Sequence, residues 1–414
     1  MPGKFLLTKL EKAWVLYDVG NSAFILLVST LFPIYFNAIA QQAGISSADY
    51  LAYWGYATSA VTVIVAISGP VLGTMTDFRG LKKPIFIYSM LIGAAGCFFL
   101  GFTSSWIVFL VVYVIAKCGY SASLIFYDAM INDITSPDRV DEVSARGFAW
   151  GYIGSCIPFV AGLALVLAGG NFGMSQMTAM TAAFLISAVW WLAATVPLWV
   201  SYQQKYEIAP QPKIVRSSFL RLAETIKHMR REKHVFLFLL AFFCYIDGVY
   251  TIIDMATAYG TALGLDTTGL LLALLLTQVV AFPATLLFGK LSGRYPAKKL
   301  ISVCIAAYMA IAVFAFRLDS QTEFWILAAC VGMFQGGIQA LSRSYFAKII
   351  PPEKTGEYFG IFDICGKGAS FLGTMLVSMT TQMTGNMKYG IGSLLILFIL
   401  GFILFQKSSN LVPK

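Results

Sequence analysis

The same short pattern occurs twice in this chain of 414 residues, each time in a polar loop between two long apolar runs. The first copy reads GTMTDFRGLKK at 73–83, and the second reads GKLSGRYPAKK at 289–299. From Gly73 to Gly289 the separation is 216 residues, slightly more than half of the chain. A loop repeated at matching places indicates an internal repeat, so the sequence predicts two units built on one plan.

The composition places both units in a membrane. Hydrophobic residues make up 58% of the sequence and charged residues 12%, whereas a soluble domain carries about 25% charged residues. The apolar runs are repeatedly long enough to supply the roughly 20 helical residues that cross a hydrocarbon core. We therefore expect an all-α membrane protein.

Hydropathy and the polar loops between the apolar runs predict twelve transmembrane helices. They lie near 13–40, 50–76, 84–102, 105–132, 144–168, 177–201, 235–262, 268–292, 299–316, 322–347, 356–382 and 388–406. Divided at the longest polar stretch, they form two pseudo-symmetric six-helix bundles over 1–201 and 234–414, with a linker at 202–233. The linker is either an amphipathic helix on the membrane surface or a solvated connector.

The positive charges fix the expected orientation. If the N-terminus is cytoplasmic, twenty-four of the 29 Lys and Arg residues fall in cytoplasmic segments. The positive-inside rule then predicts a multi-pass protein of the cell (inner) membrane with both termini in the cytoplasm. The net charge of +9 follows from this topology, so it predicts contact with the lipid bilayer and gives no reason to expect nucleic acid as a partner.

Several chemistries have no basis in the sequence. The seven cysteines fall inside predicted helices without a Cys-x-x-Cys pair, and the only histidines are His228 and His234. Neither pattern is typical of a metal site. The sequence also contains no Walker-type phosphate loop and no nucleophile with a base beside it. We expect no metal, no cofactor and no enzymatic activity.

The repeated loop predicts a latch at the cytoplasmic face. In the first copy Gly73 precedes Asp77, Gly80 permits a tight turn, and Lys82 and Lys83 begin the next helix. A carboxylate at a helix end can accept a charge-assisted hydrogen bond from a basic residue or from a neighbouring helix N-terminus. Such a contact would form only when the cytoplasmic side is closed.

The second copy keeps Gly289, Lys298 and Lys299 but has Gly293 where Asp77 stands in the first. The latch should therefore be asymmetric and stronger in the N-terminal half. The alternative interpretation is a pair of generic basic loops on the cytoplasmic face. The loop resembles the one between the second and third helices of the major facilitator superfamily. This resemblance extends over all twelve helices and implies a cavity lined by the first, fourth, seventh and tenth.

Ionisable side chains inside membrane helices cost roughly 2.5–3.5 kcal/mol each on insertion scales, so they are candidates for function. The first helix carries Asp18 and Ser22 on one stripe with Asn21 beside it, and the fourth places Lys117, Ser121 and Asp128 on one face. Lys117 and Asp128 are separated by about 16 Å along the helix. Each therefore needs a partner on another helix.

Two further helices present polar stripes. The seventh offers Asp247, Tyr250 and Asp254, and the tenth offers Gln335, Gln339 and Arg343. These four helices are the ones that the resemblance assigns to the cavity. Arg343 lies in the cytoplasmic third, where it could alternatively extend to the surface.

The eleventh helix adds Asp363 and Lys367, an i,i+4 pair that could simply neutralise itself. We predict that Asp128 and Asp247 carry protons, since a desolvated carboxylate can alternate between a cation partner and a proton. Asp363 and Lys367 are further candidates for proton coupling.

Three other stretches sharpen the resemblance. They read AWVLYDVGNSAF at 13–24, RGFAWGYIG at 146–154, and GGIQALSRS at 336–344, the last accompanied by EYFG at 357–360 and GK at 366–367. They look like the autophagy-related vacuole effluxer family, whose bacterial members mostly lack an assigned substrate. Because yeast members are implicated in exporting amino acids, the resemblance implies efflux of a small zwitterion.

Such a ligand suits the predicted cavity. Its carboxylate could meet Lys117 or Arg343, its ammonium could meet a carboxylate, and Trp150, Tyr152 and Tyr250 could cover an apolar side chain. We therefore predict a monomeric, proton-coupled secondary transporter. One alternative is an exporter of organic anions or amphiphilic compounds, for which the two cations would matter more. Another is a membrane sensor or scaffold that acts through 202–233 without transporting.

Overall fold

A computed structural model of the protein describes residues 5–209, 214–229 and 232–411. The N-terminal part contains α1 (Lys9–Ser29), α2 (Leu31–Gln42), α3 (Ser47–Thr76), α4 (Lys82–Leu100), α5 (Trp106–Ala129), α6 (Ile131–Ile134), α7 (Val140–Ala168), the 3-10 turn η1 (Gly169–Phe172) and α8 (Gln176–Ser201). Helix α9 (Ile214–Met229) follows in the linker. The C-terminal part contains α10 (Lys233–Ala262), α11 (Thr267–Ser292), α12 (Ala297–Phe316), α13 (Gln321–Ile349), the 3-10 turn η2 (Pro352–Lys354), α14 (Thr355–Thr384) and α15 (Met387–Leu411).

The fold is all-α, with twelve long helical passages as the sequence predicts. The first passage is α1 and α2 together, interrupted at Thr30. Among the described residues, eleven passages are long and apolar enough to cross a membrane. The twelfth passage is α14, a helix of 30 residues.

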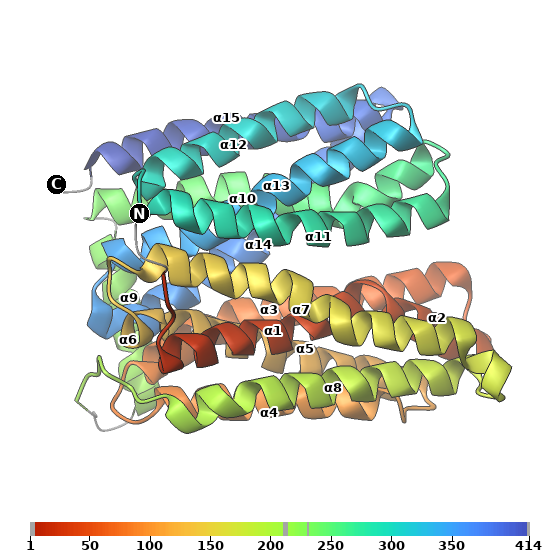
Figure 1. Cartoon of the computed structure of the whole chain (residues 1–414), viewed down its shortest axis with the longest axis horizontal. Helices are drawn as coiled ribbons and strands as arrows, with labels where there is room; N and C mark the ends of the chain where they lie inside the picture. The colour runs from red at the N-terminus through yellow and green to blue at the C-terminus, as the bar shows by residue number, and fades with distance from the viewer. Residues whose placement is uncertain (1–4, 210–213, 230–231, 412–414) are drawn as a thin grey trace.

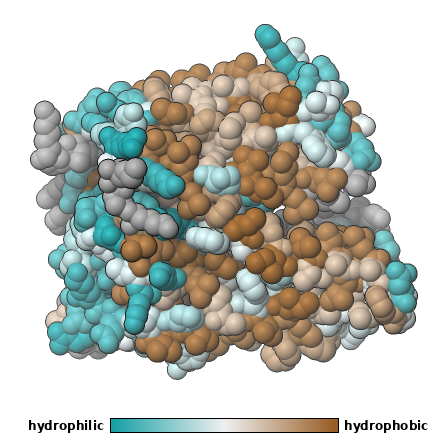
Figure 2. All heavy atoms as spheres, in the orientation of Figure 1, coloured by the Kyte–Doolittle hydropathy of each residue, from teal (hydrophilic) through white to brown (hydrophobic). Residues whose placement is uncertain are grey.

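The helices form two bundles, one above the other in Figure 1, with the N-terminal part below and the C-terminal part above. Both chain termini lie at the same end of the molecule, which we call the termini end. Helix α9 also lies at this end, beside α3 and close to α14. Apolar side chains cover the middle of the surface in Figure 2, whereas polar ones gather towards the two ends, as expected for a protein surrounded by lipid.

Buried aromatic side chains fill the interior of each bundle. In the N-terminal bundle, Trp14 stacks on Tyr127 with the ring centroids 4.3 Å apart. In the C-terminal bundle, Phe242 stacks on Phe362 at 4.0 Å. The bundles contact each other where α3 packs on α14 and where α7 packs on α11 and α13. These contacts bring the polar stripes of different helices together.

Candidate functional site

A buried arginine joins the two bundles at their interface. The Arg343 guanidinium comes from α13, and its Nη1 lies 2.9 Å from Asp128 Oδ1 on α5 and 3.7 Å from Asp18 Oδ2 on α1. Its Nε donates to Ser144 Oγ at 2.9 Å, and its Nη2 donates to the Ser144 carbonyl at 3.0 Å. Arg343 is 2% exposed, so it does not extend to the surface. The sequence could not show which helix would supply its partner.

Two aromatic rings and the backbone of α7 pack closely against this arginine. The guanidinium carbon lies 4.6 Å from the Trp14 ring centroid and 4.2 Å from that of Phe148. A Cβ on Gly147 would approach Asp18 Oδ2 to 2.9 Å and Arg343 Nη2 to 3.1 Å. Glycine at this position therefore lets α7 pass directly beside the charged cluster.

A second charged region lies further from the termini end. Lys117 Nζ on α5 sits 4.7 Å from the Tyr120 ring centroid and 6.0 Å from that of Phe24. Its positive charge acts on Asp254 of α10, in the other bundle. Tyr250, on the same helix, lies within electrostatic range of Asp363 and Asp128. The structure thus brings charged or polar groups from α5, α10 and α14 into one region.

Other predicted residues join α7 to the neighbouring helices. Tyr152 donates its hydroxyl hydrogen to Gln339 Oε1 at 3.1 Å, which links the two bundles. The Trp150 ring packs against Phe282 of α11, with centroids 5.2 Å apart. Asn21 donates to Asp18 Oδ1 at 3.3 Å. The remaining candidates are Ser22, which faces Gly151 of α7, and Ser121 and Gln335, which are buried.

Asp247 belongs to a separate place in the structure. Its Oδ1 accepts hydrogen bonds from the Gly373 N–H of α14 at 2.8 Å and from the Thr251 hydroxyl at 3.3 Å. Asp247 is fully buried. It therefore sits at the crossing of α10 and α14, apart from the Arg343 cluster. The side chain of Lys367 lies outside the described residues, so its predicted pairing with Asp363 stays a prediction.

The first repeated loop meets the second bundle through Asp77. This carboxylate caps the start of α14, because Oδ1 accepts from Gly356 N–H at 2.8 Å and Oδ2 from Glu357 N–H at 3.0 Å. A Cβ on Gly73 would come within 2.2 Å of the Gly356 carbonyl oxygen. Close backbone approach and a helix N-terminus together hold α3 against α14. We call this set of contacts the seal.

A buried lysine completes the seal. Lys82 is fully buried, and its Nζ donates to Asp133 Oδ2 at 3.0 Å and to Thr355 Oγ1 of α14 at 3.1 Å. Asp133 also accepts from the Tyr202 hydroxyl at 2.6 Å. Sequence reasoning missed Asp133, Thr355 and Ser144, because they lie at helix ends or look like ordinary small polar residues. The turn itself requires Gly80, whose φ is 76°.

The charge state of Asp77 depends on this environment. Burial raises its pKa to about 7, and the neighbouring Glu357 carboxylate also raises it. The Lys82 ammonium and the two N–H donors from α14 act in the opposite direction. The carboxyl is therefore poised to gain or lose a proton near neutral pH, at a point where two bundles meet.

The second repeated loop makes different contacts. Gly289 faces the N-terminal bundle closely, since a Cβ there would lie 2.7 Å from the Ala145 Cβ. The other positions of the repeat differ from those of the first loop. Gly293 ends α11, and Lys298 and Lys299 are exposed, whereas Lys82 is buried. Lys83 of the first loop is half-buried.

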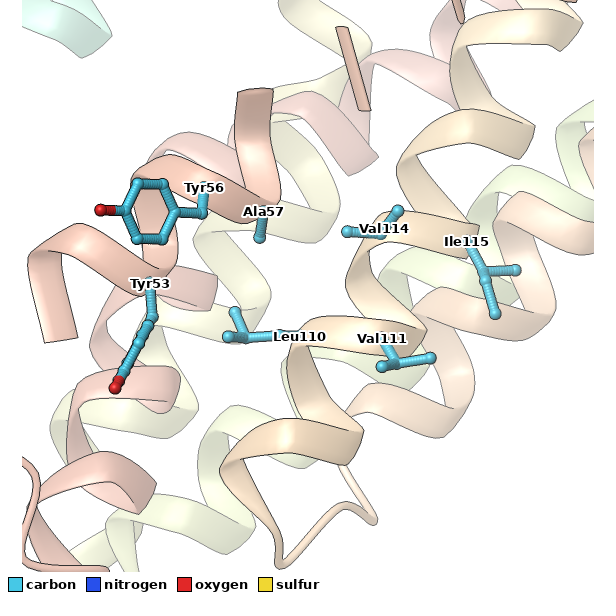
Figure 3. Close-up of a pocket in the computed structure, with 7 residues that line it drawn as sticks. All are labelled: Tyr53, Tyr56, Ala57, Leu110, Val111, Val114 and Ile115. Carbon is cyan, nitrogen blue, oxygen red and sulfur yellow. The ribbon is translucent and has the colours of Figure 1, made fainter. Parts of the chain in front are cut away.

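An open surface pocket lies away from these groups. It has a volume of about 320 Å³ and is lined by Tyr53, Tyr56, Ala57, Leu110, Val111, Val114 and Ile115 of α3 and α5 (Figure 3). Tyr56 is 70% exposed and Val111 53% exposed, so the pocket opens on the outer surface of the bundle. Because no charged residue lines it, we do not assign it to solute binding.

Within the described residues, no three His, Cys, Asp or Glu side chains come together as metal ligands. The charged groups instead form ion pairs and hydrogen bonds between the bundles. Such an arrangement can bind and release charged solutes or protons as the bundles move.

The family described as "Vacuole effluxer Atg22 like" matches residues 8–410. The chain belongs to this Atg22-like family. A Bacillus subtilis (strain 168) protein described as an uncharacterized MFS-type transporter, YxiO, is 43% identical over 402 residues, covering 96% of this chain and 94% of that protein. Autophagy-related protein 22 of Kluyveromyces lactis is 23% identical over 379 residues, covering 83% of this chain and 76% of that one.

Solved structures agree on the fold. The MFS transporter FucP in its outward conformation gives a TM-score of 0.74 at 15% identity, with 97% of each chain covered. An outward-facing bacterial homologue of the iron transporter ferroportin gives 0.72 at 15% identity, covering 97% of this chain and 98% of that one. This Atg22-like protein is therefore an MFS-type transporter.

Proposed function

We propose that this Atg22-like transporter is a proton-coupled secondary transporter that exports a small zwitterionic metabolite, such as an amino acid, by alternating access. The observation that carries the proposal is the buried cluster of Arg343, Asp18 and Asp128, which joins helices of both bundles. Buried charges are costly in a membrane protein, so a cluster on the helices that face the partner bundle supports a role in transport. With cytoplasmic termini, the described conformation is sealed towards the cytoplasm.

The second charged region suits the solute. Lys117 comes from one bundle and Asp254 from the other, and their opposite charges interact. A zwitterion between them would present its carboxylate to Lys117 and its ammonium to Asp254. The rings of Phe24 and Tyr120 beside Lys117 would contact an apolar side chain of the solute. Tyr250, Gln335 and Trp150 line the path to the Arg343 cluster in this proposal.

Proton coupling would follow from separation of the cluster. When the cytoplasmic side opens, Arg343 leaves with the C-terminal bundle while Asp18 and Asp128 stay with the N-terminal one. A carboxylate that loses its cation partner in a poorly hydrated site binds a proton more readily. Opening and protonation would thus be linked, and a proton gradient could drive the cycle. Asp247 and Asp363 on α10 and α14 are the further proton-coupling candidates.

Reconstituted protein in liposomes with an imposed pH gradient tests this proposal. We expect gradient-driven transport of a labelled amino acid by the unaltered protein. Asp128→Asn should abolish the response to the gradient while preserving exchange of solute down its own gradient, and Asp247→Asn should weaken it. Full gradient-driven transport by both variants would contradict proton coupling through these carboxylates.

A specific observation also favours organic anions as solutes. Lys117 lies against two aromatic rings, and such a site can bind an amphiphilic carboxylate without any ammonium group. Asp254→Asn separates the two possibilities. It should impair transport of a zwitterion, whereas it should leave transport of an organic anion unchanged or improved.

A further inference from the structure

The linker is attached to the seal from its first residues. Ile208 exchanges backbone hydrogen bonds with the first repeated loop, because Arg79 N–H donates to the Ile208 carbonyl at 3.0 Å and Ile208 N–H donates to the Asp77 carbonyl at 2.8 Å. The N–H groups of Lys205 and Tyr206 donate to Asp133 at 3.1 and 2.9 Å. The linker is therefore tied to the same residues that close the seal.

Helix α9 then turns polar side chains towards the protein. Ser218 and Thr225 are buried and Arg221 is largely buried, at i, i+3 and i+7 spacing on one face. Phe219 and Leu220 are 54% and 58% exposed on the other side. An ordinary amphipathic helix would bury the apolar residues against the protein. The inverted pattern indicates that the inner face of α9 has a specific polar partner.

That partner is Glu357 at the start of α14. Arg221 Nη2 lies 3.1 Å from Glu357 Oε2, and the Glu357 side chain is fully buried. Among the described residues, Glu357 Oε1 has no hydrogen-bond partner. The Arg221 guanidinium also lies over the Phe78 ring of the first repeated loop, 5.2 Å from its centroid. One side chain from the linker therefore touches the seal residues of both bundles.

The charges explain why this contact matters. The N–H of Glu357 donates to Asp77, which places two buried carboxyl groups next to each other at the seal. Like charges in a buried site repel each other, and a buried carboxylate without a cation is strongly destabilising. Arg221 supplies a positive charge to Glu357 of α14 while its guanidinium also lies over Phe78 of the first repeated loop.

We propose that Arg221 is a positioning residue that keeps the seal closed and so sets the balance between the two conformations of the transport cycle. The linker then contributes to transport by tuning this balance, without touching the solute. In this respect the inference rests on the proposed alternating-access cycle, but the closed state of the seal can be measured without any solute.

Spin labels at Ser136→Cys and Lys298→Cys, in a background without native cysteines, report the distance between the bundles at the termini end. Both positions are exposed and belong to different bundles. Arg221→Ala should lower the ratio of closed to open molecules by about tenfold or more, since it removes the cation that forms an ion pair with the buried Glu357 carboxylate, although Lys354 still acts on it from further away. Arg221→Lys should retain most of the closed population. Lys227→Ala, on the exposed side of the same helix, should leave the distances unchanged.

The double variant Arg221→Ala with Glu357→Gln separates charge compensation from simple packing. It removes the carboxylate that needs a cation, so it should restore the closed population, provided that thermal unfolding confirms a folded protein for each variant. An unchanged distance distribution in Arg221→Ala would overturn the proposal. So would an equal shift in Lys227→Ala, or a double variant that stays as open as the single one. Absence of transport by the unaltered protein, together with the expected distance changes in these variants, would count against the proposed function alone.

Discussion

The two repeated loops occupy equivalent places in the chain, yet they make different contacts. In the first, Asp77 caps α14 and Lys82 is fully buried against Asp133 and Thr355. In the second, Gly293 has no side chain to cap a helix, and Lys298 and Lys299 are exposed. Both loops join two long helices and keep basic residues. Among the described residues, only the first loop forms a network of buried charged groups.

Other residues join the two bundles where α13 meets the start of α7. Lys348 Nζ lies 2.6 Å from Asp141 Oδ2, and the Ser144 hydroxyl donates to the Ala340 carbonyl at 2.8 Å. These contacts join α13 to the start of α7 and involve no charged residue of the second loop. A sequence repeat therefore predicts a shared fold more safely than it predicts shared chemistry.

The largest difference between the loops should appear when a lysine is removed. Lys82→Met breaks a fully buried ion pair, which typically costs about 3–5 kcal/mol, and Asp133 keeps its other hydrogen bonds. Lys298→Met removes an exposed lysine and should change stability by less than about 0.5 kcal/mol. Thermal unfolding of both variants in detergent measures the contrast. Equal effects would show that the two loops are energetically alike.

An effect on the balance between the closed and open conformations should follow from Asp77→Ala. Two buried N–H donors at the start of α14 would lose their acceptor, at about 1–3 kcal/mol each while the seal stays closed. In the open state water can replace the acceptor, so the variant should shift molecules towards the open conformation by at least about tenfold. Distance measurements between the bundles report this shift. Gly293→Ala is the matched control, because its Cβ would meet only Lys290 O at 3.5 Å.

The smallest effect is a dependence on pH that belongs to the first loop alone. The pKa of Asp77 is about 7 in the closed seal, above the ordinary value near 3.9 expected when the open loop is hydrated. The closed state thus binds protons more tightly, so lowering the pH from 8 to 6 should favour it by up to about tenfold. The gain should be lost as the pH rises through 7. Asp77→Asn should remove the dependence, and an unaltered dependence in that variant would assign it to another group.

Much of the fold could be predicted from the sequence. Apolar length and polar loops locate the twelve helical passages to within a few residues, because a membrane imposes both constraints on every helix. The interruption at Thr30 lies three residues before Pro33, whose missing N–H permits a kink in a membrane helix. Helix α9 was predicted as one alternative for the linker, but its buried polar face was not.

The site was harder to predict than the fold. Intramembrane charge identified Asp18, Asp128 and Arg343 as candidates, but their pairing depends on how helices from different bundles cross. The same criterion selected Asp247, which the structure places at another helix crossing. Glu357 was noted only within a stretch that resembles the family, and Asp133 was not a candidate, because acidic residues at helix ends are common. Their importance comes from burial, which a single sequence does not reveal.

The glycines at the crossing of α3 and α14 affect how quickly the molecule can move. Gly73 lies against Gly356, and a Cβ on Gly360 would come within 2.7 Å of the Pro70 Cα, so backbone meets backbone there. Glycine has no side-chain rotamers to lose when two surfaces come together. Re-forming this crossing in each cycle therefore requires almost no ordering of side chains. The slow part of closing should be the removal of water from Asp77 and Lys82.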